Sequence, residues 1–284
     1  MMLVAAVAAK AEVELAYEAG AEVVSAYIWR GQYNGGLGFQ PDLEIGYDGE
    51  HTALRFGVWG NIGASDWGFR KGLEENENGD PNTRFVPELD LMLNFSFFGA
   101  SVGFNHYYYC DGSNFFSWQK ADKIQEDGNT STTEVWAGVN IGEIVGDFDL
   151  HVNWYTTIAG NDLRVSTVYP EMASAYDVVE RAWSSYLEIG GGYTWEDLGL
   201  TLSGEIGMSP WASDLYGNEK FAVTNLSVKL NKAFDFDVCE LDIFAQGSLN
   251  PDGLNKENAY IKASGDDKLY QQKLNGVIGV GIWF

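Results

Sequence analysis

The sequence predicts an all-β fold, a 12-stranded antiparallel up-and-down transmembrane β-barrel, on three observations. Apolar and polar residues alternate along many segments of about ten residues, as the strands of such barrels require. Short and long connections alternate between these segments. The chain also ends on an aromatic residue that completes an alternating segment. Beyond the first nine residues, no apolar run is long enough for a membrane helix.

The strands are predicted from alternation with a period of two residues, bounded by turn residues. The segment 85–97 is the clearest, because Leu89, Leu91 and Leu93 share one face while Glu88 and Asp90 share the other. Scanning the whole chain in this way places about twelve strands. Their ranges are 22–33, 40–48, 51–62, 85–97, 100–110, 132–141, 148–158, 184–194, 200–208, 222–230, 238–249 and 272–284.

The connections alternate in length along the chain. Short ones are predicted at 48–50, 98–99, 142–147, 195–199 and 231–237, and longer polar ones near 34–39, 63–84, 111–131, 159–183, 209–221 and 250–271. Outer-membrane barrels have short periplasmic turns and long external loops. An even number of strands then places both termini on the periplasmic side of the outer membrane of a Gram-negative bacterium.

The last strand, 272–284, carries the most specific signal. Leu274, Ile278, Val280 and Ile282 fall on one face, and Phe284 completes that face as the final residue. A terminal aromatic behind alternating apolar positions is typical of the signal that barrel assembly machinery reads. We therefore expect Phe284 to be an assembly signal and the assembly machinery to be a partner.

The chain is predicted to be one domain, 12–284, after a signal-peptide remnant at 1–11. Residues 1–9 are small or apolar, and Ala9-Lys10-Ala11 resembles a cleavage site. The net charge of −24 argues against a nucleic-acid partner, whose phosphates would be repelled. Cys110 and Cys239 fall at opposite ends of the predicted barrel, so we expect two free thiols rather than a disulfide.

If the apolar face of each strand meets lipid, the polar face lines the lumen, because a charge at mid-membrane costs about 2–4 kcal/mol. Two arrangements of these charges remain open. Acidic residues could surround a narrow cation-preferring passage, or acids and bases could pair into a network that plugs the barrel. The predicted lumen-lining residues are Glu22, Arg30, Asp42, Glu44, Arg55, Glu88, Asp90, Glu134, Asp149, His151, Glu188, Glu205, Lys229, Glu240 and Asp242.

The remaining chemistry-bearing residues give weaker signals. Trp29, Trp59, Trp154, Tyr108, Tyr193 and Trp283 lie near predicted strand ends, where interfacial anchoring is the expected role. The three histidines are dispersed, so no transition-metal site is expected. No catalytic residues and no cofactor are predicted.

The segments Ser25-Ala-Tyr-Ile-Trp-Arg-Gly-Gln32, Gln40-Pro41 and Gly57-Val-Trp-Gly-Asn61 resemble the N-terminal signature of the TorF-type porins. The resemblance covers about the first forty residues after the signal remnant and implies an outer-membrane barrel with channel function. It also implies that Arg30, on the polar face of the first strand, points into the lumen near its external end. The motif positions are Tyr27, Trp29, Arg30, Gly31, Gln40 and Trp59.

The sequence thus predicts a porin-like, non-enzymatic channel in the outer membrane for small polar or cationic solutes. Its lipid-facing surface would have outer-membrane lipid and lipopolysaccharide as partners. A closed structural or partner-binding barrel that acts through its long loops is the alternative. A membrane-embedded lipid-modifying enzyme is a third interpretation.

Overall fold

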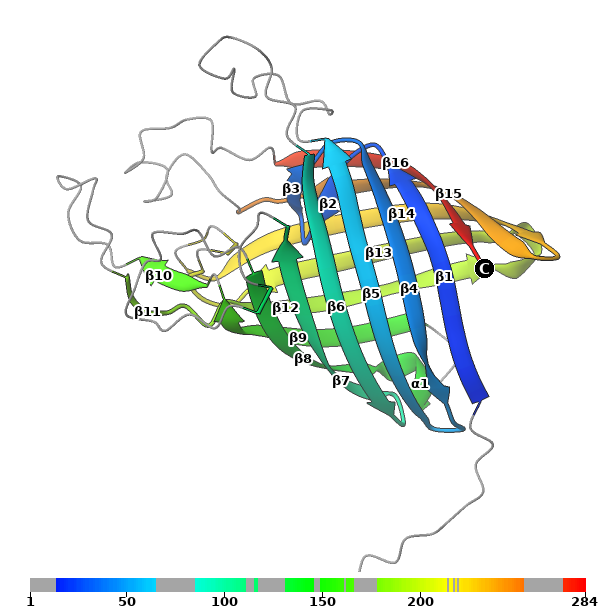
Figure 1. The fold of residues 1–284 in the computed structure, drawn as a ribbon, viewed down its shortest axis with the longest axis horizontal. Coiled ribbons are helices and arrows are strands. Elements are labelled where there is room, and N and C mark those ends of the chain that lie inside the picture. The colour runs from blue at the N-terminus through cyan, green and yellow to red at the C-terminus, as the bar shows by residue number, and fades with distance from the viewer. Residues whose placement is uncertain are drawn as a thin grey trace, which may run out of the picture.

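The computed structural model shows a closed antiparallel barrel of twelve strands (Figure 1). It describes residues 14–64, 85–110, 115–116, 131–145, 149–160, 162–165, 178–213, 215–216, 218, 220–252 and 273–284. Residues 1–13 lie outside this set, so the predicted signal remnant does too. The predicted fold class is confirmed.

Each barrel strand pairs with its neighbour in the chain, and β1 closes the circle on β16 through pairs that run from Gly20 with Trp283 to Val24 with Gly279. The twelve strands are β1 (Glu14–Val24), β4 (Gly38–Asp48), β5 (Thr52–Ala64), β6 (Phe85–Phe97), β7 (Ala100–Tyr109), β8 (Ser131–Asn140), β9 (Asp149–Gly160), β12 (Ser185–Trp195), β13 (Leu200–Ser209), β14 (Ala222–Phe236), β15 (Cys239–Leu249) and β16 (Leu274–Trp283).

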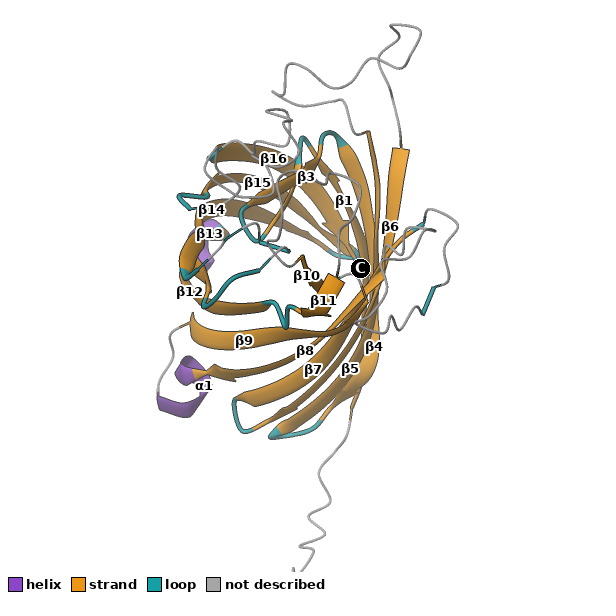
Figure 2. Cartoon of the chain, turned by 90° about the vertical axis from the view of Figure 1, so that its left-hand side faces the viewer, coloured by secondary structure: helices purple, strands orange, loops and turns teal. Residues whose placement is uncertain are grey.

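The two ends of the barrel differ in what they carry (Figures 1 and 2). The helix α1 (Ile141–Val145) lies at the same end as the carboxyl terminus, and the small sheet of β10 (Leu163–Val165) and β11 (Val178–Arg181) lies at the other. The 3-10 turn η1 (Glu196–Leu198) joins β12 to β13. None of the helices in the described ranges is long and apolar enough to cross a membrane.

The first predicted strand, 22–33, is wrong. The barrel strand is β1, which ends at Val24, and the chain then forms a separate hairpin of β2 (Tyr27–Trp29) and β3 (Gln32–Gly35). The outward face of β1 is partly alanine, at Ala19 and Ala21, so its alternation is weak in the sequence. The turn predicted at 231–237 is also wrong, because β14 continues to Phe236 and pairs there with Cys239.

The outward face of the barrel is apolar. Monomeric soluble proteins rarely expose so large a continuous apolar surface, whereas the lipid-facing band of a transmembrane barrel consists of such residues. Phe284 extends this face at the end of the chain, with 62% of its surface exposed. Exposed residues on the outer wall include Leu43, Ile45, Leu54, Phe56, Leu93, Phe95, Val102, Leu202, Ile206, Val228, Leu230, Ile243, Ile278, Val280 and Ile282.

The inward face is polar and holds one small apolar cluster of Val24, Ala26, Phe244 and Val277. Phe244 lies over Gly279 of the neighbouring strand, where a Cβ atom would come within 2.3 Å of its ring. Glycine at this position therefore lets a large ring lie flat against the wall. Cys110 and Cys239 are not joined by a disulfide in the described part of the chain.

A barrel closed by β1–β16 pairing has no open sheet edge from which detergent can unfold the wall. Samples kept unheated in SDS are therefore expected to migrate faster on a gel than boiled samples. Identical migration before and after boiling would contradict the closed barrel.

Candidate functional site

The β2–β3 hairpin joins β1 to β4 but turns into the lumen instead of extending the wall. At its base, the ring of Tyr27 lies 5.4 Å from that of Trp59 on β5, measured between centroids. Ile28 and Tyr33 pack on the apolar cluster around Phe244. The hairpin thus contacts β5 on one side of the place where it enters the lumen, and β15 and β16 on the other side.

The tip of the hairpin depends on two residues with left-handed backbone. Arg30 has φ +48° and Gly31 has φ +81°, which is the combination that a two-residue type I′ turn requires. A Cβ atom on Gly31 would lie 2.1 Å from the carbonyl oxygen of Thr224 on β14. The tip therefore rests directly on the backbone of β14, and only glycine fits.

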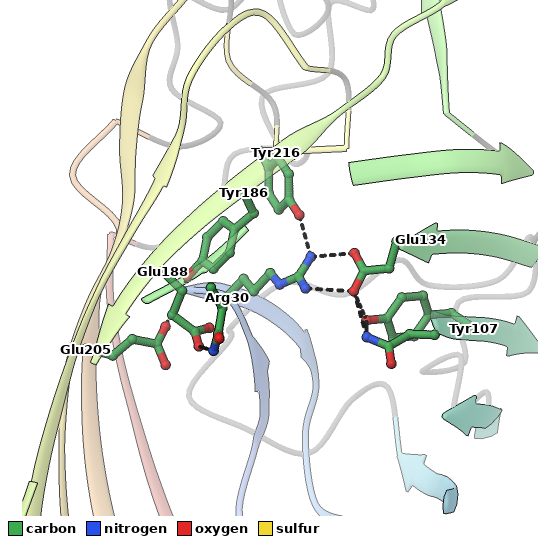
Figure 3. A network of polar contacts seen from close by, with 9 residues as sticks. Arg30, Tyr107, Glu134, Tyr186, Glu188, Glu205 and Tyr216 are labelled. Carbon is green, nitrogen blue, oxygen red and sulfur yellow. Dashed lines mark hydrogen bonds and ion pairs between the residues drawn. The ribbon is translucent and has the colours of Figure 1, made fainter. Parts of the chain in front are cut away.

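Arg30 reaches from this tip to β8, where it forms a bidentate ion pair with Glu134 (Figure 3). Its Nη1 donates to Oε2 at 2.9 Å and its Nη2 donates to Oε1 at 2.8 Å. The side chains are 7% and 1% exposed, respectively, so the pair is shielded from solvent. Two parallel charge-assisted hydrogen bonds fix the orientation as well as the distance of the guanidinium.

Further donors complete the hydrogen bonding of this pair. Oε1 of Glu134 also accepts from Nδ2 of Asn105 at 2.9 Å and from the hydroxyl of Tyr107 at 2.6 Å. Nη1 of Arg30 also donates to the hydroxyl of Tyr216 at 2.6 Å. A buried ion pair is stable only when its remaining donors and acceptors are satisfied, and this network meets that condition.

Aromatic rings enclose the guanidinium. Its Cζ lies 4.1 Å from the ring centroid of Tyr155, 4.6 Å from that of Trp29 and 4.7 Å from that of Tyr186. These distances are within the range of cation–π attraction. We call the whole assembly the Arg30 cluster; it comprises Trp29, Arg30, Asn105, Tyr107, Glu134, Tyr155, Tyr186 and Tyr216.

A cavity of about 320 Å³ adjoins the Arg30 cluster inside the barrel. Two carboxylates, Glu188 of β12 and Glu205 of β13, contribute to its lining. The rest of the wall is mainly polar. It consists of Ile28, Trp29, Arg30, Gly31, Asn105, Tyr107, Tyr155, Asn225, Ser227 and Gln246.

The strand register places the predicted lumen residues of the wall on its inward side. It pairs Glu22 with Gln40, Glu188 with Asn153, and Asp242 with Ala233, on the face opposite the exposed leucines and isoleucines. The inward wall positions are Glu22, Asp42, Glu44, Arg55, Glu88, Asp90, Glu134, Asp149, His151, Glu188, Glu205, Lys229, Glu240 and Asp242.

The structure brings some of these residues together. Arg55 bonds Glu44 at 3.0 Å and also bonds Asp48. His151 lies 3.4 Å from Glu188, between Nε2 and Oε1. The ammonium of Lys229 lies over the ring of Phe244 at 4.0 Å from its centroid.

Glu88 and Asp90 are nearly buried instead, at 4% and 5% exposure. Each keeps one carboxylate oxygen that has no hydrogen-bond partner among the described residues. These two acids therefore differ from Glu188 and Glu205, whose carboxylates border open space.

Two predictions about this region are wrong. Arg30 does not lie on the polar face of the first barrel strand; it lies at the hairpin tip, because β1 ends six residues earlier. Trp29 and Trp59 are not interfacial anchors, since Trp29 stacks on Tyr216 and Trp59 contacts Tyr27 within the lumen. Trp283 pairs in register with Gly20 and Glu240 on the inward face, so it is not a lipid-facing anchor either.

The motif positions gather around the hairpin. Tyr27, Trp29, Arg30 and Gly31 form its first strand and tip, Trp59 supports its base, and Nε2 of Gln40 donates to Oδ1 of Asn61 at 3.2 Å. Sequence reasoning missed the other half of the cluster. Tyr107, Tyr155 and Tyr186 could have been found as large aromatics at inward positions of their strands, but Tyr216 lies in a connection with no such pattern.

No family model and no curated protein matches this chain. Among solved structures, the chain is similar to an outer membrane channel from Pseudomonas putida F1, with 11% identity, coverage of 95% of this chain and 93% of that one, and a TM-score of 0.46. It is also similar to Salmonella typhi OmpF in complex with daunomycin, with 12% identity, coverage of 96% and 97%, and a TM-score of 0.39. At these identities and scores, neither likeness assigns a function.

Gly31→Ala should displace the hairpin tip, because the new methyl group meets the backbone of Thr224 and the left-handed conformation disfavours alanine. A strained backbone position of this kind costs about 1–3 kcal/mol. Urea unfolding in detergent micelles should show a loss of that size. Gly247→Ala is the matched control, since a Cβ atom there meets nothing within 4 Å. Equal stability of both variants would contradict the tight fit of the tip.

Glu134→Gln should lower the free energy of unfolding by about 3–5 kcal/mol, because it leaves the buried guanidinium of Arg30 without its counter-charge. Adding Arg30→Met removes that unpaired charge and should recover part of the loss. The same urea titrations measure both variants. Additive losses in the double variant would show that the two side chains are not energetically coupled.

Proposed function

We propose that this protein is an outer-membrane channel that conducts small polar and cationic solutes through an acidic lumen. One observation carries the proposal: the inner wall encloses a polar cavity with two carboxylates, Glu188 and Glu205, instead of a packed apolar core. A polar interior of this kind supports passage of hydrated solutes, and its charge sign favours cations.

The outer-membrane location rests on the wall of the barrel. Its outward apolar residues would face lipid and lipopolysaccharide, and closed β-barrels together with helices are the structures that satisfy backbone hydrogen bonds within a bilayer. The exposed Phe284 supports a role as the signal for the barrel assembly machinery. In this orientation, the end with α1 and the carboxyl terminus is periplasmic, and β10 and β11 lie on the external side.

The Arg30 cluster sets the width of the passage in this proposal. The β2–β3 hairpin crosses the lumen and is held on β8 by Glu134 and on β14 by the contact of Gly31 with Thr224. Solutes would pass beside the hairpin, along Glu188 and Glu205. Conductance is therefore expected to be small compared with that of wide porins.

A closed barrel is the second candidate, and the same hairpin is the observation that favours it. The hydrogen bonds between Arg30, Glu134 and their neighbours, and the aromatic rings around them, would suit a plug. In that case, function would reside in the external connections. Resemblance to the TorF-type porins in Tyr27, Trp29, Arg30 and Gly31 supports the channel instead.

The test is conductance of the purified barrel in planar bilayers under a salt gradient. The native protein is expected to give small current steps and a reversal potential of cation-preferring sign, and Gly31→Ala is expected to give larger steps because the hairpin no longer seats. Gly247→Ala should match the native protein. Absence of current in both the native protein and Gly31→Ala would favour the closed barrel.

Selectivity provides a separate measurement. Glu188→Gln and Glu205→Gln remove the negative charges that border the cavity, so each should move the reversal potential toward zero. Glu50→Gln is the control, because Glu50 lies in the exposed turn between β4 and β5. A native barrel that prefers anions would contradict the role of the acidic lumen.

A further inference from the structure

The cavity beside the Arg30 cluster is asymmetric in charge. Of the three carboxylates in this part of the lumen, Glu134 is neutralised by its bidentate contact with Arg30 (Figure 3). Glu188 and Glu205 form no direct ion pair with a lysine or an arginine among the described residues, although Arg30 lines the same cavity. Their contacts are His151 and Asn153 for Glu188, and Tyr186 and Asn225 for Glu205.

The hydrogen bonds of these two acids fall on one oxygen each. Oε1 of Glu188 accepts from Asn153 at 3.0 Å, and Oε1 of Glu205 accepts from Tyr186 at 3.0 Å and from Asn225 at 2.6 Å. No described residue donates to Oε2 of either side chain, and neither Oε2 is among the buried atoms that lack partners. Each carboxylate is therefore held in place by one oxygen and has the other available to a ligand.

The amide groups of the wall add to this excess of acceptors. Asn105 donates its Nδ2 to Glu134 at 2.9 Å, so its carbonyl oxygen remains as an acceptor in a residue that lines the cavity. Asn225 also donates its Nδ2 to Glu205, but its carbonyl oxygen already accepts from the hydroxyl of Ser248 at 2.8 Å. A space bordered by acceptors and by net negative charge is complementary to a ligand that is rich in N–H donors and positively charged.

Spacing and volume limit the size of that ligand. Gly190 pairs with Glu205 and Glu188 pairs with Gly207, so the two acids are diagonal neighbours on adjacent strands. Diagonal neighbours on one face of a sheet lie about 7–8 Å apart. A cavity of about 320 Å³ is at the lower end of the range for small-molecule sites.

We propose that this cavity is a binding site for a small organic cation with ammonium or guanidinium groups, held between Glu188 and Glu205. The proposal names the solute class of the channel and rests on the proposed function. Arg30 has an indirect part in it. Because Arg30 neutralises Glu134, the remaining negative charge beside the cavity belongs to Glu188 and Glu205. The hairpin that carries Arg30 also covers one side of the site.

Two other side chains near this site, those of Lys229 and His151, can carry a positive charge, and neither is placed to neutralise both carboxylates. Lys229 is two positions from Ser227 on the inward face of β14, but its ammonium lies over the ring of Phe244. His151 contacts the oxygen of Glu188 that Asn153 also contacts, and it carries a charge only when protonated. Two carboxylates against at most one positive charge on His151 are expected to leave a net negative charge toward the cavity.

The test is isothermal titration calorimetry on the folded barrel in detergent micelles, with 1,4-diaminobutane as the probe. Saturable binding of one molecule per barrel is expected, with no comparable binding of neutral 1,4-butanediol or of the dianion butanedioate. Glu188→Gln and Glu205→Gln should each weaken the binding of the diamine by about tenfold or more, because each removes one charge that borders the cavity. Heat-modifiable gel migration verifies that these variants are folded.

Glu50→Gln, in the exposed turn, should bind the diamine as the native protein does. Binding of butanediol as tightly as the diamine, or diamine binding unchanged in both glutamine variants, would overturn the site. Because calorimetry needs no current, the two proposals can fail separately. Cation conductance without diamine binding would overturn the site alone, whereas diamine binding in a barrel that never conducts would support the site and overturn the channel.

Discussion

The structure depends on one constraint: a single β-sheet that closes into a barrel has only two faces, one outside and one inside. Successive side chains of each strand point to opposite sides, so a wall that is apolar outside must carry its polar residues inside. The pairs of β1 with β4 and β16 and of β15 with β16 follow this rule without a register shift, whereas the β8–β9 and β13–β14 pairs each contain one shift. The acidic residues at inward strand positions are thus a geometric consequence of an acidic chain with an apolar exterior.

An acidic lumen in turn explains why an arginine can be buried in it. Arg30 is the first of the two turn residues at the hairpin tip, and its backbone is left-handed. Residues other than glycine rarely adopt this conformation, and the strain costs about 1–3 kcal/mol. The bidentate contact with Glu134 and the ring of Tyr155 offset that cost, since each interaction gains strength away from water. The hairpin is held inside the barrel by contacts at its tip as well as at its base.

The sequence predicts the wall well and the contents of the lumen poorly, for a physical reason. Alternation is a local property, so segments such as 85–97 were predicted with the bounds that β6 has. Aromatic residues at positions 27, 29 and 33 continue one face of the predicted strand 22–33, so this pattern does not distinguish a hairpin in the lumen from a continuing wall strand. The pairing of Arg30 with Glu134 spans 104 residues and depends on how the barrel closes, which no window of sequence contains.

Burial also separates residues that look alike in the sequence. Glu88 and Glu188 are both acids at inward strand positions, yet Glu88 is almost fully buried and Glu188 borders the cavity. The difference arises from the hairpin, whose Tyr27 enters on the side of β5 and β6, while its tip leaves space beside β12 and β13. The lumen can pack tightly, as the cluster of Val24, Phe244 and Val277 demonstrates. A plug selected only for closure would be expected to extend such packing across the barrel. The polar space kept beside Glu188 and Glu205 instead supports the proposed passage and its proposed cation site.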